Sequence, residues 1–329
     1  MGMYFVCMKK LSQNQWIAII GLAMLLAVSG YMYKYKTKQT SVEFAVFNTY
    51  CSIQYIFYPT ADPDTLSRDI IAELQQLHNR INIYDPKSEL SQLNKTAVEK
   101  PFHCSPELWS ILKASREAWR VTDGVFDISV GPLMHLWGFH GKRNTIPTET
   151  EIAEALTKVG LDKVQYDEKN HTIYFTTPEM RLDLGGIAKG YALDLAVKQL
   201  KKVRKNYAGV IFDFGGNIYA SGKENTGRKF SIGVRDPVDA QIVRKQFILE
   251  NQFIATSANY ERALQIGEKK IGHIVSPITG RPVKTYASVT AKASSGWCSD
   301  VFSTAVFAGG EKIIKKIHES YPETEFFLQ

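Results

Sequence analysis

Apolar residues recur at helical spacing in several parts of the chain. Asp62 followed by Pro63 is typical of a helix start, and apolar side chains then recur every three or four residues from Leu66 to Ile81. This spacing predicts a helix that ends at about Ile83. The same pattern, with Thr148 and Glu151 as a capping box in one case, predicts further helices over 105–124, 148–160, 188–202, 299–308 and 311–319.

Stretches rich in β-branched and aromatic residues lie between these helices. The segment 42–58 is rich in Val, Phe, Tyr and Ile and is read as one bent strand or as a hairpin. Shorter strands are predicted over 163–166, 172–176, 181–184, 210–214, 229–234, 246–250, 287–291 and 324–328. Because strands and helices follow in mixed order with hairpin-like neighbours, the predicted class is α+β, not a doubly wound parallel sheet. We expect one folded domain over 41–329.

The first 40 residues have a different character. Lys9 and Lys10 precede an apolar run from Trp16 to Tyr33, about the 18 residues that a bilayer-spanning helix needs. Small residues at 27–29 also fit a signal-peptide cleavage site, so a cleaved export signal competes with a retained anchor, which we favour. Residues 1–40 are therefore expected to be an export signal or membrane anchor with a linker. The folded domain is expected on the periplasmic, extracytoplasmic side of the cell inner (cytoplasmic) membrane.

Composition narrows the function classes. The 329 residues are 44% hydrophobic with a formal net charge of +7, and basic residues cluster in the first 40 positions and in 198–205. No recognisable nucleic-acid module accompanies this charge, so no nucleic-acid partner is expected. The four cysteines show no close metal-ligand spacing and indicate no disulfide framework.

A glycine-rich turn joins a predicted strand to a helix at 182–190, Leu-Asp-Leu-Gly-Gly-Ile-Ala-Lys-Gly. Glycines let a ligand approach the backbone, the helix start offers amide groups to an anion, and Lys189 adds a positive charge. Phosphate is the natural ligand. The alternative is a tight turn with a solvated lysine, because the motif is neither a Walker A loop nor a dinucleotide fingerprint.

Asp300 and Thr304 are four residues apart on a predicted helix, so their side chains project from one face. Two oxygen ligands suit Mg²⁺, which takes few protein ligands and completes its shell with phosphate and water. Alternatively, Asp300 stands near a helix start and Thr304 bonds back to a backbone carbonyl.

Glycines and aromatic residues are dense between Gly124 and Phe139. Such a segment can hold a flat heteroaromatic ring, with Asp127 bonding its polar edge, although Phe126 and Trp137 also suit core packing. Tyr84 can stack on a ring or cap the core. His273 lies between turn residues, where it contacts phosphate, carries a proton or has a structural role.

Read in order, these segments resemble the FAD:protein FMN transferase (ApbE) family. The likeness extends from about residue 42 to the C-terminus. The matching segments are Tyr84-Asp85-Pro86 with 88–91 and Asn94, Gly124 to Asp127 with 131–133, Asp183 to Gly190, 214–217, 255–257, His273 to Gly280, 288–290, and Ser299-Asp300 with Thr304-Ala305.

The resemblance implies a mixed-sheet fold with packed helices and a cleft that binds FAD. Its metal ligands for Mg²⁺ would be Asp300, Thr304 and the backbone carbonyl of Gly186. Its FAD contacts would be Phe47, Tyr84, Val125, Phe126, Asp127, Asp183, Lys189, His273 and Ile274. Two departures stand out: Phe47-Asn48-Thr49 occupies the usual place of Met-Gly-Thr, and Ser276 replaces an acidic residue before Pro277.

The implied activity is transfer of FMN from FAD to a serine or threonine hydroxyl of a target flavoprotein, with release of AMP. The implied partners are acceptor subunits of membrane or exported redox systems. His273 and Asp300 are the candidates for accepting the hydroxyl proton. The alternatives are a Mg²⁺-dependent FAD pyrophosphatase that gives FMN and AMP, and a non-catalytic extracytoplasmic flavin-binding protein.

Overall fold

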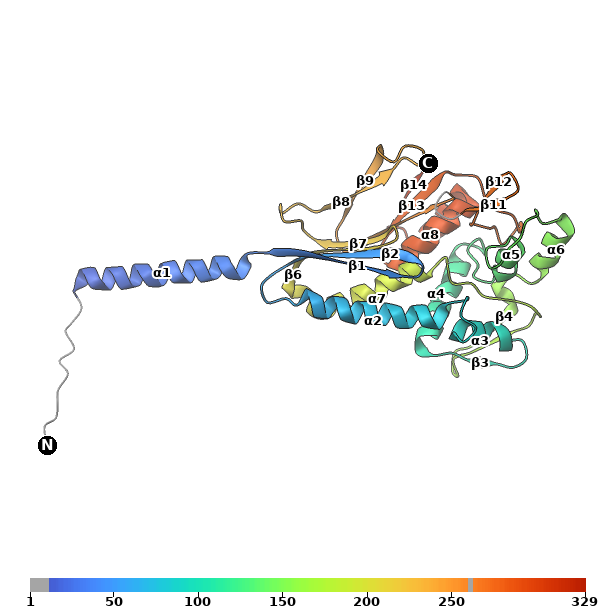
Figure 1. Cartoon of the computed structure of the whole chain (residues 1–329), viewed down its shortest axis with the longest axis horizontal. Coiled ribbons are helices and arrows are strands. Elements are labelled where there is room, and N and C mark those ends of the chain that lie inside the picture. The colour runs from blue at the N-terminus through green and yellow to red at the C-terminus, as the bar shows by residue number, and fades with distance from the viewer. Residues whose placement is uncertain (1–11, 260–262) are drawn as a thin grey trace, which may run out of the picture.

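The architecture rests on a long antiparallel sheet. A computed structural model describes residues 12–259 and 263–329 (Figure 1). Strands β1 (Lys38–Val46) and β2 (Thr49–Phe57) form a hairpin, which decides between the two readings of this segment. The sheet begins at Lys38 and therefore includes residues that the sequence assigned to the linker.

Antiparallel neighbours complete the sheet beyond this hairpin. In the described part of the chain its order is β1-β2-β6-β7-β10-β13-β14. The added strands are β6 (Tyr207–Phe214), β7 (Asn217–Gly222), β10 (Gln252–Ala258), β13 (Ser288–Ala293) and β14 (Glu325–Leu328). With its packed helices this sheet confirms the predicted α+β class.

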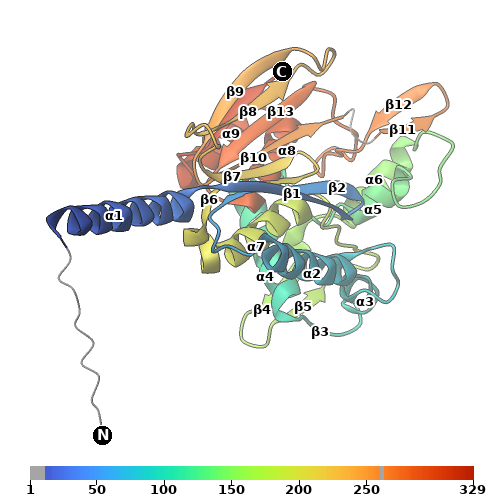
Figure 2. The ribbon, with the colours of Figure 1, turned by 60° about the vertical axis from the view of Figure 1, so that its left-hand side comes forward.

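Helices α2 (Pro63–Ile81), α7 (Ala188–Val203) and α8 (Gly296–Gly309) pack on one face of the sheet (Figures 1 and 2). The carboxylate of Asp62 caps α2 by accepting from Thr65 N at 3.0 Å, as the sequence predicted. The apolar stripe of α2 enters the main core together with buried strand residues such as Ile53 and Phe212. Helix formation and burial thus use the same side chains.

The hairpin of β8 (Phe230–Arg235) and β9 (Val243–Leu249) forms a separate two-stranded sheet that contacts β7. Phe230, Phe247 and Leu249 pack there with Ile56, Ala220 and Ile254 from the long sheet. This cluster is a second core, distinct from the main core that the helices cover.

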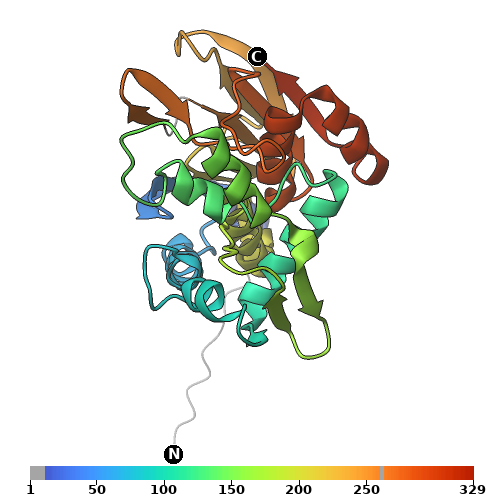
Figure 3. The same cartoon turned by 90° about the vertical axis from the view of Figure 1, so that its right-hand side faces the viewer.

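A third core lies at the end of the molecule away from α1 (Figure 3). Here α5 (Gly131–Leu136) and α6 (Glu149–Thr157) pack beside the hairpin of β11 (Ala263–Ile266) and β12 (Lys269–Gly272). The remaining elements are α3 (Glu89–Thr96), β3 (Phe102–His103), α4 (Pro106–Val121), 3-10 turns at Leu161–Lys163 and Arg204–Asn206, β4 (Val164–Asp167), β5 (Thr172–Phe175) and α9 (Glu311–Ser320).

One predicted strand is wrong. Residues 181–184 make a single bridge, between Arg181 and Val130, and no ladder. The amide of Leu182 donates to Asn94 Oδ1 at 2.7 Å and that of Asp183 donates to Ile128 O at 2.7 Å. Because these amides bond to a side chain of α3 and to a loop carbonyl, the segment is extended without joining a sheet.

Helix α1 (Gln13–Tyr35) is 23 residues long and carries exposed apolar side chains such as Leu25 and Leu26. Among the described residues it is the one helix long and apolar enough to cross a membrane, and a signal sequence would pass the same test. Only two residues separate it from β1. Lys9 and Lys10 lie outside the described residues.

Candidate functional site

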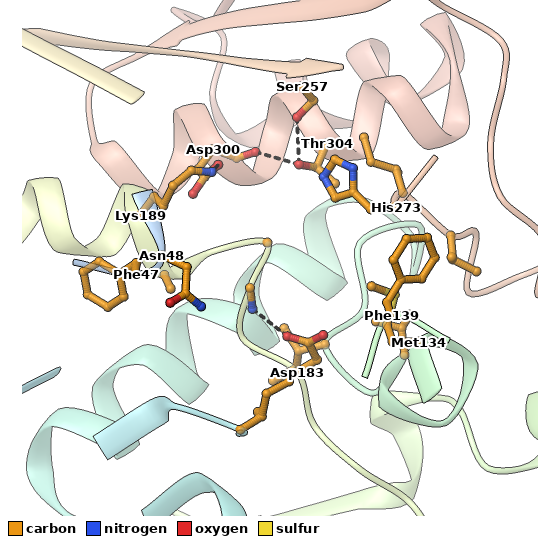
Figure 4. A pocket seen from close by; sticks show the side chains of 18 of the residues that line it. Phe47, Asn48, Met134, Phe139, Asp183, Lys189, Ser257, His273, Asp300 and Thr304 are labelled. Carbon is orange, nitrogen blue, oxygen red and sulfur yellow. Dashed lines mark hydrogen bonds and ion pairs between the residues drawn. The ribbon is translucent and has the colours of Figure 1, made fainter. Parts of the chain in front are cut away.

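A cavity of about 760 Å³ lies between the main core and the third core. Its volume is typical of small-molecule and cofactor pockets. Twelve residues singled out from the sequence all line it: Phe47, Tyr84, Val125, Phe126, Asp127, Asp183, Gly186, Lys189, His273, Ile274, Asp300 and Thr304. They come from segments that are far apart in the chain, and the fold brings them together (Figure 4).

One side of the cavity, which we call the helix wall, is built where α7 crosses α8. A Cβ added to Gly190 would lie 2.3 Å from Gly296 O, so only glycine permits this close approach. The carboxylate of Asp194 on α7 accepts from the amides of Gly296 and Trp297 at 2.7 and 2.9 Å. Burial raises the pKa of Asp194 to about 6, although both hydrogen bonds lower it. These contacts fix the start of α8 against α7.

Asp300 lies on α8 with its carboxylate buried. Its Oδ2 accepts from Gly190 N at 2.8 Å, while its Oδ1 is 3.7 Å from Lys189 Nζ. The side chain is 6% exposed, so this charge is shielded from bulk water. Buried charges in proteins are paired or coordinate metals, and this carboxylate has the Lys189 ammonium as its charged neighbour.

Thr304 follows one turn after Asp300 on the same face. Its hydroxyl donates to Asp300 O at 3.1 Å, so the back-bonding alternative is also realised. The Thr304 hydroxyl is 2.9 Å from Ser257 Oγ on β10, and Ser257 also contacts Ser303. This network orients the lone pairs of Thr304 (Figure 4). Ser257 lies in the matching segment 255–257, but no role was predicted for it, because its partners lie more than 40 residues away.

The glycine turn lies directly before α7. The amide of Gly185 donates to Asp183 Oδ1 at 2.7 Å, and Gly186 faces the ring of Phe126, which a Cβ would approach to 3.1 Å. Helix α7 begins at Ala188 without a side-chain cap, and Lys189 occupies its first turn. The amides of Ala188 and Gly190 already donate to Leu184 O and Asp300 Oδ2, so the group that this helix start offers an anion is the ammonium of Lys189.

The opposite side of the cavity, the loop wall, consists of turn residues 82–85 and 139–140. His140 Nε2 lies 2.9 Å from Asp183 Oδ2, and the rings of His140 and Tyr84 meet edge to face at 6.0 Å. Tyr84 is 62% exposed. Sequence reasoning missed His140, although its place directly after the Trp-Gly-Phe segment was a usable signal.

Asp127 is buried and bonded within its own loop. Its Oδ1 accepts from the amide and hydroxyl of Ser129 at 2.7 and 2.6 Å, and its Oδ2 accepts from Leu161 N at 3.1 Å. Burial raises the pKa of Asp127, and these hydrogen bonds oppose the rise. The carboxylate therefore holds its own loop in place beside the cavity.

Two tight turns meet at another edge of the cavity. Phe47 and Asn48 join β1 to β2 with φ of 53° and 54°, and Gly215 joins β6 to β7 nearby. Asparagine tolerates this left-handed conformation, which explains how Asn48 replaces the glycine usual in the resembling family. The Phe47 ring lies edge to face with His78 at 5.5 Å, and burial lowers the pKa of His78.

The His273 loop follows β12. His273 is half-buried, and Figure 4 shows its ring beside Thr304. Ser276 Oγ accepts from the amides of Ile278 and Thr279 at 3.3 and 3.2 Å. Ser276 thus organises the turn in the way that a carboxylate would at this position.

Comparison with known proteins decides the family. The model of the ApbE family matches residues 47–328. The chain belongs to the ApbE family. The FAD:protein FMN transferase of Haemophilus influenzae is 30% identical over 315 residues, covering 92% of this chain and 88% of the relative.

Solved ApbE structures agree with this assignment. The flavin transferase ApbE from Vibrio cholerae superposes with a TM-score of 0.78 at 26% identity, covering 89% of this chain and 94% of that one. The ApbE protein of Thermotoga maritima gives a TM-score of 0.79 at 28% identity, covering 88% and 94%. The ApbE match begins at Phe47 and thus includes all twelve predicted cavity residues.

Proposed function

We propose that this chain is an FAD:protein FMN transferase that depends on Mg²⁺. The observation that carries the proposal is the helix wall, where a carboxylate, a hydroxyl and a glycine turn face one cavity. A relative with this activity in its name covers almost the whole chain. The exact acceptor and the metal are part of the proposal.

The donor set fits a hard cation. Asp300 and Thr304 contribute oxygen atoms, and we assign the third ligand to the backbone carbonyl of Gly186, so all donors are oxygens as Mg²⁺ prefers. The described residues contain no cluster of three His, Cys, Asp or Glu side chains, which argues against a zinc-type centre. When bound, Mg²⁺ would offset negative charge on the pyrophosphate during transfer.

The residues around this set are assigned to FAD. Lys189 would bind the pyrophosphate, and Phe47, Tyr84, Val125, Phe126 and Ile274 would contact the flat or apolar parts of the molecule. Asp183 and the backbone of Asp127 would hydrogen-bond its polar edges.

In the proposed reaction the oxygen of an acceptor serine or threonine forms a bond to the FMN phosphorus. The bond from that phosphorus to the bridging oxygen breaks, and AMP leaves with the electron pair. The hydroxyl proton needs an acceptor. Both oxygens of Asp300 have partners in Gly190 and Lys189, so we assign this role to His273 beside Thr304.

The experiment is an incubation of the purified chain with FAD, Mg²⁺ and an acceptor flavoprotein subunit of a membrane or exported redox system. Mass spectrometry should find one FMN added to a serine or threonine, stable to denaturation. Asp300→Ala should lower the rate on the order of 100-fold or more, because it removes a group that holds transition-state charge. AMP and FMN without modified acceptor would favour the pyrophosphatase, and FAD binding without turnover would favour the flavin-binding protein.

We further propose that α1 is a retained anchor in the cytoplasmic membrane, with the folded domain on its periplasmic side. Support comes from the length of α1 and its exposed apolar side chains. Protease added to intact spheroplasts should digest the domain while a cytoplasmic control protein survives. A protected domain, with a periplasmic control digested, would reverse the orientation.

A further inference from the structure

The two ends of the long sheet differ in chemistry. At one end the β1–β2 and β6–β7 turns line the cavity. At the other end the same strands begin or finish close to α1, and exposed basic side chains gather there. We call this group the basic end: Lys36, Lys38, Lys201, Lys202, Lys205, Lys223, Arg228 and Lys229.

Hydrogen bonds join the segments of the basic end into one surface. Asn225 bonds to Thr37 at 3.5 Å and to Gln39 at 2.6 Å, which ties the β7–β8 loop to the start of β1. The amide of Tyr58 donates to Asn206 O, and that of Lys223 donates to Ala208 O, both at 3.0 Å. Figures 1 and 2 show the C-terminal end of α7 beside the junction of α1 and β1.

Carboxylates border this surface and reduce its charge. Glu224 is 3.9 Å from Arg228, and Glu250 is 2.6 Å from Lys229. Asp62 and Asp64 lie at the nearby start of α2. The lysines at 36, 38, 201, 202, 205 and 223 leave the surface positive after these carboxylates are considered.

Helix α1 enters the domain at the basic end through only two residues, Lys36 and Thr37. If α1 spans a bilayer, this short connection keeps the basic end next to the lipid headgroups. Basic residues near an anionic bilayer surface each strengthen binding about five-fold, and the effect falls off within a Debye length. The connection thus provides the proximity that this attraction needs.

We propose that the basic end docks on anionic phospholipid headgroups and holds the cavity away from the membrane. Strand β1 has nine residues, so Phe47 lies roughly 30 Å beyond Lys38 at about 3.3 Å per residue. The acceptor must therefore present its hydroxyl at about this height above the bilayer. This inference rests on the proposed anchoring by α1.

The experiment places the full chain in nanodiscs that contain phosphatidylglycerol or phosphatidylcholine alone, with headgroup-labelled lipid as energy acceptor. Cys7 is replaced by serine, and a donor dye is attached at Thr226→Cys on the basic end or at Tyr50→Cys near the cavity end. Both sites are exposed, Tyr50 by 88%. The cysteines at 51, 104 and 298 are buried and should not react.

Energy transfer from the Thr226 dye should be higher in phosphatidylglycerol than in phosphatidylcholine, and 0.5 M salt should abolish the difference. The Tyr50 dye should show the opposite trend, because docking holds the cavity end away from the lipid. The combined variant Lys201→Glu, Lys202→Glu, Lys205→Glu should lose the effect, since the docked fraction falls on the order of 100-fold. The control variant Lys95→Glu, Lys100→Glu, Lys169→Glu has the same charge change and should retain it.

The proposal would be overturned if energy transfer from the Thr226 dye were equal in the two lipids at low salt. It would also be overturned if the two triple variants lost the lipid dependence equally. Failure of the anchor is detected separately, because the chain would then leave the nanodiscs in 0.5 M salt. Transfer of FMN to an acceptor in detergent solution reports on the proposed activity independently of both.

Discussion

The helix wall and the loop wall of the cavity are built in opposite ways. On the helix wall, Asp300 is buried and is held by a backbone amide, while the glycines Gly190 and Gly296 allow α8 to pack closely against α7. On the loop wall, Tyr84 is 62% exposed, and its hydroxyl reaches Phe139 O only at 3.4 Å. Asp300 is therefore held in place inside the protein, whereas Tyr84 lies at the surface.

This difference follows from what each wall must do. Stabilising a transition state requires oxygen atoms held within a fraction of an ångström, which packed helices provide. A large flat ligand enters and leaves in each turnover, and turns on the surface permit that movement. Substitutions on the helix wall should thus alter kcat, and those on the loop wall should alter KM for FAD.

Next to the loss expected for Asp300→Ala, the largest fall in kcat is expected from Asp194→Asn, which weakens the attachment of α8 to α7. An amide offers one acceptor where the carboxylate offered two, so the N–H of Gly296 or Trp297 loses its partner at a cost of about 1–3 kcal/mol. A displaced α8 start moves Asp300 and Thr304, and kcat should fall about 10-fold with KM for FAD little changed. Steady-state kinetics at saturating Mg²⁺ measure this change.

The stability of the Asp194→Asn variant should also depend on pH. Folding raises the pKa of Asp194 from 3.8 to about 6, so the native state binds the proton more tightly than the unfolded state. The parent therefore loses stability relative to the variant as pH rises from 4 to 7, by about 3 kcal/mol in total. Urea unfolding of the detergent-solubilised chains at both pH values measures the difference.

Asp167→Asn is the matched control for this pH effect. Hydrogen bonds, above all from the Asn170 side chain, lower the pKa of Asp167, which is exposed in a turn. The free energy of unfolding of the parent, relative to Asp167→Asn, should therefore rise with pH, and by less than it falls relative to Asp194→Asn. If the stability difference between the parent and Asp194→Asn did not change with pH, folding would not raise the pKa of Asp194. Burial would then not be the dominant influence on this carboxylate.

Local signals predicted several of the helices. The caps and apolar spacing of α2 and α6 are contained in short segments of the chain. Asp300 and Thr304 are four residues apart, which places both on one face of any helix. These expectations needed no tertiary information. The family resemblance then gave the twelve cavity residues, where single motifs had left structural alternatives open.

Tertiary partners account for what was missed. Asp194 resembles any polar helix position in the sequence, and its partners Gly296 and Trp297 lie 102 and 103 residues further along the chain. The extended segment 181–184 has strand-like composition, but Asn94 and Ile128 take its amides. Such pairings depend on which distant segments the tertiary fold brings together, and hydrophobic periodicity does not encode this.

The smallest change in kcat is expected from His140→Ala on the loop wall. His140 Nε2 is 2.9 Å from Asp183 Oδ2, while Gly185 N holds Asp183 Oδ1, so the histidine sets the direction of the second carboxylate oxygen. Losing this one hydrogen bond to a charged group should raise KM for FAD about 10-fold and leave kcat within about two-fold. The exposed His103 on β3 provides the control, since His103→Ala should change neither constant. Steady-state transfer rates over a range of FAD concentrations separate the two constants. If His140→Ala instead lowered kcat strongly at an unchanged KM, the loop wall would take part in the chemical step, and the division between the two walls would be wrong.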